Sequence, residues 1–290
     1  IKLIKDNKQY FLKGTFLNAN SLIDILINNQ KNNFSVIDIN SKIKVKIDEV
    51  RLDKNHNLKN FTGILVLQNK SIEKAKLIGN FLNDKELRFT INTKGNNKIT
   101  TLYLDKAEPI VKRYDFIKGF NGGELDLYSS KKLNKSTTTL KIYDFKLKEL
   151  PALTKILTLA SLQGIADILT GEGIRFDELE MNFVNEGSLI TINEMYAIGP
   201  AISVLMDGYI EEDKLISLRG TLVPATTINK AIGNIPVLGK ILVGSKTGEG
   251  VFGVSFKIKG PPKNLETTVN PIKTLTPRFI TRTLEKIKKN

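Results

Sequence analysis

The chain has 290 residues, 41% of them hydrophobic and 26% charged, which fits neither a disordered chain nor one embedded throughout in a membrane. It has no cysteine, and His56 is its single histidine, which excludes disulfide scaffolds, cysteine-ligated zinc, iron–sulfur clusters and multi-histidine metal sites. Lys and Arg outnumber Asp and Glu by 44 to 30, but only seven of the 44 are Arg. Because nucleic-acid surfaces favour Arg with interleaved aromatics, compositional drift toward Lys explains the net charge of +14 better, and no nucleic-acid partner is expected.

Alternation of apolar and polar residues predicts strands along most of the chain. It is clear over residues 61–67, 99–104, 124–128 and 138–147, and it becomes dense after residue 175. Side chains with a period of two share one face of a strand. The expected apolar face of the later strands consists of Leu179, Met181, Phe183, Ile190, Ile192, Ile202, Val204, Met206, Ile216, Leu218, Phe252, Val254 and Phe256.

Short turn signals separate these runs and predict antiparallel hairpins. They are Asn121-Gly122-Gly123, Asn185-Glu186-Gly187, Glu211-Glu212-Asp213 and Gly260-Pro261-Pro262.

Three segments are expected to be helical instead, around residues 150–169, 227–243 and 275–289. The first has apolar residues three and four apart, and two interpretations stay open for it: packing on the sheet, or contact with a membrane through Leu153, Ile156 and Leu157. The third combines an apolar stripe with a basic face. It is either a terminal helix with a solvated charged face or a membrane contact through Phe279, Arg282 and Lys286.

No constellation of residues typical of catalysis is found. His56 lies in a polar turn and is expected to be a solvated loop residue. The acidic run Glu211-Glu212-Asp213 lacks the spacing of a calcium loop, and the glycine pairs at 171–173 and 248–250 lack the pattern of a phosphate loop. We therefore expect a protein that is not an enzyme and has no catalytic residue, metal site or cofactor.

Strands with one apolar face need that face to be covered. A closed β-sandwich would cover it with protein, whereas a curved open sheet would leave a groove suited to acyl chains. Periodicity alone leaves both architectures open and favours the filled sandwich.

From residue 115 onward the chain resembles the C-terminal region of AsmA-like envelope proteins of the YhdP type. The residues that carry the resemblance are the GG-x-L-x-L step at 120–127, the segment 142–147 before the first helix, and the GEGI-x-F-x-x-L step at 171–179. Further matching segments follow in order at 199–201, 220–224, 233–242, 248–254 and 269–271. Residues 1–114 fit only loosely, so the expected division is a β-rich body segment at 1–114 and an AsmA-like region at 115–290.

The resemblance implies a mainly β fold, a long, twisted, groove-forming antiparallel sheet of the repeating β-groove type with a few helices near its C-terminal end. It implies lipid transport: the C-terminal part of a hydrophobic groove that moves phospholipid between inner and outer membranes and supports outer-membrane integrity. The expected partners are phospholipid acyl chains, a membrane surface and an envelope protein, and the expected place is the periplasm of a Gram-negative envelope. The family's inner-membrane anchor does not occur in this sequence and is expected upstream of it. The alternative is a structural or assembly β-sandwich that acts through protein contacts.

Overall fold

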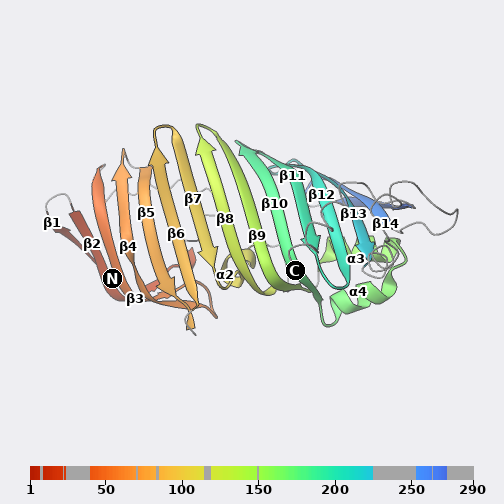
Figure 1. Cartoon of the computed structure of the whole chain (residues 1–290), viewed down its shortest axis with the longest axis horizontal. Coiled ribbons are helices and arrows are strands. Elements are labelled where there is room, and N and C mark those ends of the chain that lie inside the picture. Colours follow the sequence, from red (N-terminus) through yellow and green to blue (C-terminus); the bar gives the residue numbers. More distant parts are fainter. Residues whose placement is uncertain are drawn as a thin grey trace, which may run out of the picture. The chain divides into compact units, whose positions relative to one another are not determined.

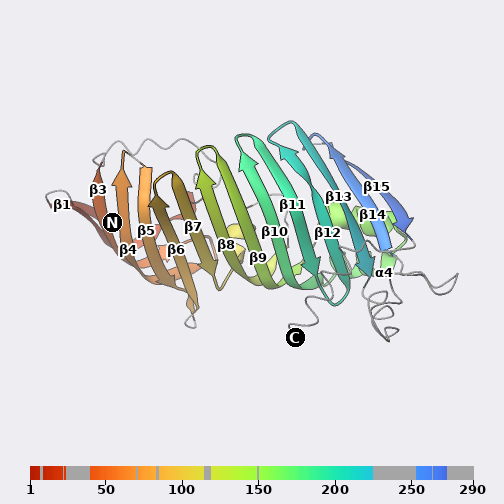
Figure 2. The same ribbon diagram turned by 45° about the horizontal axis from the view of Figure 1, so that its top comes forward.

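The computed structural model describes residues 1–6, 9–21, 23, 40–69, 71–82, 85–113, 119–148, 150–224, 253–262 and 264–272. Within these residues the chain is mainly β, and the strands pair in the order of the sequence, from β1 to β15, in one mostly antiparallel open sheet (Figures 1 and 2). The helices of the described residues are few and short. The predicted mainly β, antiparallel fold class is therefore confirmed.

The strands are long enough to present several side chains on each face. Their bounds are β1 Lys2–Asp6, β2 Gln9–Asn18, β3 Ser41–Arg51, β4 Asn57–Gln68, β5 Ser71–Asn80, β6 Glu86–Lys94, β7 Asn97–Leu104, β8 Asn121–Lys132, β9 Lys135–Leu147, β10 Ile174–Glu186, β11 Leu189–Ile198, β12 Ile202–Glu211, β13 Leu215–Pro224, β14 Gly253–Gly260 and β15 Glu266–Ile272.

Most turn predictions coincide with connections between neighbouring strands. The turns predicted at 185–187, 211–213 and 260–262 join β10 to β11, β12 to β13 and β14 to β15. The prediction at 121–123 was wrong, because these residues begin β8, with Gly122 and Gly123 at positive φ. One pairing also departs from the antiparallel rule, since β2 runs parallel to β3.

The chain divides into two compact units. The first consists of Ile1–Asp115 with Gly122–Ile142, and the second of Phe116–Asn121 with Tyr143–Asn290. In the first unit, β3 shows why these residues form a sheet with two different faces. Ile43, Val45 and Ile47 are buried, whereas the lysines between them are exposed. The period of two thus separates an apolar face from a polar one.

The helix predicted over 150–169 is two helices in the second unit, α3 Pro151–Leu159 and α4 Gln163–Thr170. The prediction of one continuous helix was wrong because the chain turns at Ser161, whose φ is 58°. The amide of Leu162 bonds to the carbonyl of Leu157, five residues back, so the regular helical ladder ends there. A third helix, α2 Glu108–Val111, belongs to the first unit.

Several predictions lie outside the described residues. They are the helices at 227–243 and 275–289, the apolar-face residue Phe252, and the membrane-contact residues Phe279, Arg282 and Lys286. No helix of the described part is long and apolar enough to cross a membrane.

Candidate functional site

The second unit carries rows of apolar side chains that run across neighbouring strands. Residues directly opposite each other in an antiparallel pair project from the same face of the sheet. Val204 lies opposite both Ala197 on β11 and Leu222 on β13, and Leu222 in turn lies opposite Val254 on β14. These four residues therefore form one continuous row across four strands.

All members of the predicted set that the structure describes project from this same face. Two more rows follow along the strands, one through Met181, Met195 and Met206, the other through Phe183, Ile192 and Gly208. We call the following residues the apolar face: Leu179, Met181, Phe183, Ile190, Ile192, Met195, Ala197, Ile202, Val204, Met206, Ile216, Leu218, Leu222, Val254, Phe256 and Ile258.

Burial varies along the apolar face. Among the predicted members, those that are buried are Ile192, Ile202, Val204, Val254 and Phe256. Those that remain partly exposed are Leu179, Met181, Phe183, Ile190, Met206, Ile216 and Leu218. The half of the face toward the 185–188 and 211–214 hairpins is therefore more open to solvent than the half that contains Ile202.

Sequence periodicity missed Met195 and Ala197. A strict period of two from Ile192 would place Glu194 and Tyr196 on the apolar face. A β-bulge intervenes instead: β11 supplies an extra residue between Ile192 and Met195 against both of its neighbours, β10 and β12. The bulge returns Met195 and Ala197 to the apolar face. The sequence did contain a signal for this bulge. Met195 and Ala197 are both apolar and two residues apart, but they are shifted by one position from the alternation of Ile190 and Ile192.

The first unit has an apolar face of its own with a similar gradient. Val45 on β3 belongs to a row that continues through Leu77 and Phe89 on β5 and β6. Leu77 and Phe89 are partly exposed, whereas Leu58 and Leu104, farther along the same face, are fully buried. This face is therefore closed at one end and partly open at the other.

Stacked aromatic rings close part of the second unit. Phe145 lies between Phe120 and Phe176, with ring centroids 5.5 Å and 5.3 Å apart, and all three rings are buried. Offset stacking of this kind adds to the stability that burial already gives. Phe120, Phe145 and Phe176 thus have a packing role.

The helix α3 directs its predicted membrane-contact residues into the protein. Leu153, Ile156 and Leu157 are 7%, 3% and 0% exposed, and α3 packs near β15. In this arrangement these three side chains belong to the core, which matches the interpretation of a helix packed on the sheet.

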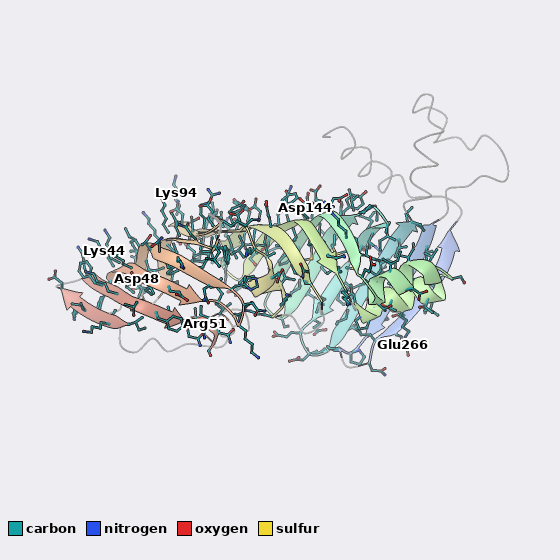
Figure 3. All side chains as sticks on the ribbon, turned by 90° about the horizontal axis from the view of Figure 1, so that it is seen from below. Lys44, Asp48, Arg51, Lys94, Asp144 and Glu266 are labelled. Atoms are coloured by element: carbon teal, nitrogen blue, oxygen red, sulfur yellow. The ribbon has the colours of Figure 1, made fainter. Side chains whose placement is uncertain are left out.

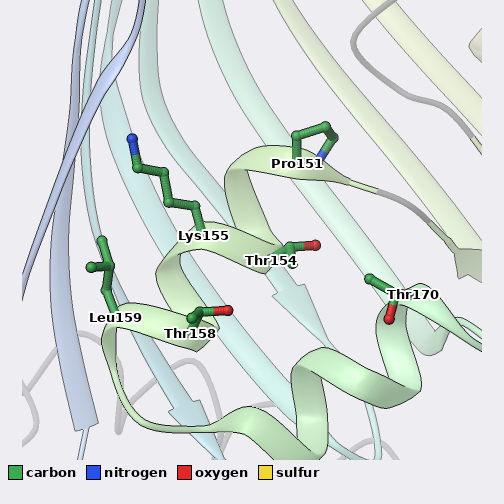
Figure 4. Close-up of a pocket in the computed structure, with 6 residues that line it drawn as sticks. All are labelled: Pro151, Thr154, Lys155, Thr158, Leu159 and Thr170. Atoms are coloured by element: carbon green, nitrogen blue, oxygen red, sulfur yellow. The ribbon is translucent and has the colours of Figure 1, made fainter.

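The outward side of α3 borders a hollow of about 550 Å³ (Figure 4). Its lining residues are Pro151, Thr154, Lys155, Thr158, Leu159 and Thr170. The hydroxyls of Thr154 and Thr170 bond to carbonyls of their own helices. Two of the three threonine hydroxyls that border the hollow are therefore engaged within their own helical segments.

His56 was expected to be solvated, but the structure buries it to 9% exposure. Its Nδ1 donates to the Asp53 carboxylate at 2.9 Å, and its Nε2 lies 3.6 Å from Oε2 of Glu108 at the start of α2. Burial alone would raise the pKa of Asp53, but hydrogen bonds from the Asn55 amide and from His56 outweigh it and hold that pKa below its usual value.

Glu108 connects α2 to the start of β8. Its Oε2 accepts a hydrogen bond from Lys112 Nζ and its Oε1 accepts one from the Gly122 amide, both at 2.7 Å. Burial acts to raise the pKa of Glu108, but these two bonds prevail and lower it. The contacts of His56 with Asp53 and Glu108 tie local elements together, and within the described residues no group of three or more His, Asp or Glu side chains could hold a metal ion.

Comparisons with protein-family models, curated proteins and solved structures found no match for this chain.

Proposed function

We propose that this chain is a non-enzymatic lipid-binding module whose apolar face contacts acyl chains. The observation that carries the proposal is the set of partly exposed Leu, Ile, Met and Phe side chains aligned in rows on one face of an open sheet. Contiguous apolar surface of this kind is costly in water and commonly marks a binding surface.

The chemistry of the face suits acyl chains better than a compact polar substrate. Its rows contain aliphatic side chains, thioethers and phenyl rings, which make non-directional contacts. Burial of a methylene group stabilises a complex by about 0.8 kcal/mol regardless of its exact position. A chain of methylene groups can therefore bind in many registers along the rows, as movement along a surface requires.

A fuller form of the proposal follows the resemblance to AsmA-like proteins of the YhdP type. In that form the chain is a periplasmic part of a conduit that passes phospholipid between the inner and outer membranes of a Gram-negative envelope. It supports outer-membrane integrity and works with a membrane surface and an envelope protein partner.

Lipid extraction tests the proposal. The purified chain would be extracted with organic solvent, and the extract analysed for phospholipid by mass spectrometry. In parallel, a fluorescent fatty-acyl probe would be added to the stripped protein. We expect copurified phospholipid, and a rise in probe fluorescence that added phospholipid reverses. Absence of lipid together with an unchanged probe signal would contradict lipid binding and favour a scaffold that acts through protein contacts.

A further inference from the structure

The polar face of the first unit is dominated by lysine. Cross-strand register places Lys13 beside Lys46, and Lys44 opposite Ile64, which in turn lies opposite Lys76. We call the following residues the lysine face: Lys2, Lys13, Lys42, Lys44, Lys46, Lys74 and Lys76. All seven are exposed, and Figure 3 labels Lys44 among the side chains that extend outward from these strands.

These lysines lack counter-charges of their own. Among the described residues, none of the seven forms an ion pair. The face also bears acidic residues, among them Asp6 at the end of β1 and Asp48, which follows Lys46 by two positions on β3, but the lysines outnumber these two by seven to two. The surface therefore carries a concentrated positive charge that is available to an anionic partner.

Apolar side chains lie among the lysines. Ile4 and Ile64 are 49% and 39% exposed. The ring of Phe11 lies between two ammonium groups, with Lys13 Nζ at 5.2 Å and Lys44 Nζ at 5.3 Å from its centroid. The lysine face thus combines positive charge with exposed aliphatic groups.

Compositional drift does not account for this distribution, because drift toward Lys would affect both units alike. The polar face of β10–β15 bears Arg219, Lys257 and Lys259 as its basic residues. The acidic residues there are more numerous: Glu178, Glu180, Glu186, Glu194, Asp207, Glu211 and Glu266. The positive charge is therefore specific to the polar face of the first unit.

We propose that the lysine face binds the surface of a bilayer that contains anionic phospholipid. Lysine ammonium groups attract such a surface, each strengthening binding by about fivefold, and aliphatic side chains such as Ile4 and Ile64 enter the headgroup region. Single-stranded nucleic acid would instead require aromatic rings free to stack on bases. On this face the ring of Phe11 is flanked by Lys13 and Lys44. The surface is on the opposite side of the strands from the apolar face of its own unit, so the proposal is independent of acyl-chain binding.

Vesicle flotation of the full chain tests this proposal. One set of vesicles contains phosphatidylcholine alone, and the other contains phosphatidylcholine and phosphatidylglycerol in equal parts. The test variant carries K42Q, K44Q, K74Q and K76Q. The matched control carries K146Q, K155Q, K257Q and K259Q, which remove the same charge from exposed lysines of the second unit.

We expect the unaltered chain to float with the anionic vesicles only, and to be released by salt. The test variant should bind them more than about tenfold more weakly, while the control stays within about twofold of the unaltered chain. Equal losses in both variants would show that net charge alone drives binding and would overturn the proposal. Tighter binding to a single-stranded oligonucleotide than to the anionic vesicles at the same salt concentration would overturn it in favour of nucleic acid.

Discussion

The ring of Phe256 on β14 lies over Gly220 on β13, directly opposite it in the ladder. A Cβ atom at Gly220 would come within 2.5 Å of Cζ of that ring, and even closer to the carbonyl oxygen of Leu205. Because Phe256 is 4% exposed, its ring has little room to move aside. The missing side chain of Gly220 is therefore what lets Phe256 pack into the apolar face.

Substitution of Gly220 by alanine should therefore destabilise the second unit. We expect G220A to lower the free energy of unfolding by about 1–3 kcal/mol, as overpacking of a dense core does. Denaturant unfolding followed by circular dichroism would measure it. Gly164 in α4 is a suitable control, because a Cβ there meets nothing within 4 Å. A loss in G164A as large as that in G220A would contradict the packing explanation.

Truncation of the central ring of the aromatic stack should cost more. Phe145 contacts both Phe120 and Phe176 and is 2% exposed, so F145A would leave a cavity between two rings. We expect a loss of about 3–5 kcal/mol in unfolding free energy, and a smaller loss for F145L, which keeps most of the volume. Similar losses in the two variants would show that the ring stacking, rather than the filled volume, is what matters.

The contact between His56 and Asp53 predicts that the folded chain loses stability at acidic pH. The pKa of Asp53 is lowered in the folded chain from a value of 3.8, and that of Glu108 from 4.5. A lowered pKa gives stability that is present above the unfolded-state value and is lost as the pH falls through the folded-state value. We expect the denaturant midpoint to fall as the pH drops below about 4.5, and to fall less in D53N. D126N alters an exposed carboxylate on β8 and should leave the acid dependence unchanged.

The hydrogen bond of Tyr103 predicts that the folded chain also loses stability at alkaline pH. Its hydroxyl donates to Asp105 at 2.6 Å, and this bond, with burial, raises the pKa of Tyr103 to about 12 from 10.0. The contribution of this hydrogen bond to the stability of the fold is fully present below the unfolded-state pKa of Tyr103, and it is lost as the pH rises from about 10 to about 12. Ultraviolet titration should show a late-ionising tyrosine component near pH 12 that is absent in Y103F. Unchanged late ionisation in Y103F would contradict this assignment.

The regular parts of the strands could be predicted from the sequence. Ile202, Val204 and Met206 alternate without interruption, and the structure places them on one face because β12 pairs with β13 in unbroken register. The same reasoning did not include Met195 and Ala197, because a β-bulge adds a residue after Ile192 and shifts the alternation by one position.

Features that depend on distant segments could not be predicted. His56 is polar in a polar turn, and its burial depends on Glu108, which lies more than fifty residues away in sequence. The break between α3 and α4 depends on positive φ at Ser161, a residue with no strong preference for that conformation. The lysine face likewise emerges only when register brings β2, β3 and β5 together.

The most direct test of lipid contact compares neighbouring residues on opposite faces of β13. Leu218 projects from the apolar face opposite Gly208, whereas Ser217 lies opposite Tyr209 on the polar face. A glutamate at either position adds the same charge to the same strand, so L218E and S217E differ mainly in the face they alter. Binding of a fluorescent fatty-acyl probe would be measured for both variants, normalised to the folded fraction found by circular dichroism. We predict that L218E binds the probe at least about tenfold more weakly than the unaltered chain, because a charge in an apolar site is costly, and that S217E binds it unchanged. Equal binding by L218E and S217E would contradict the role of the apolar face.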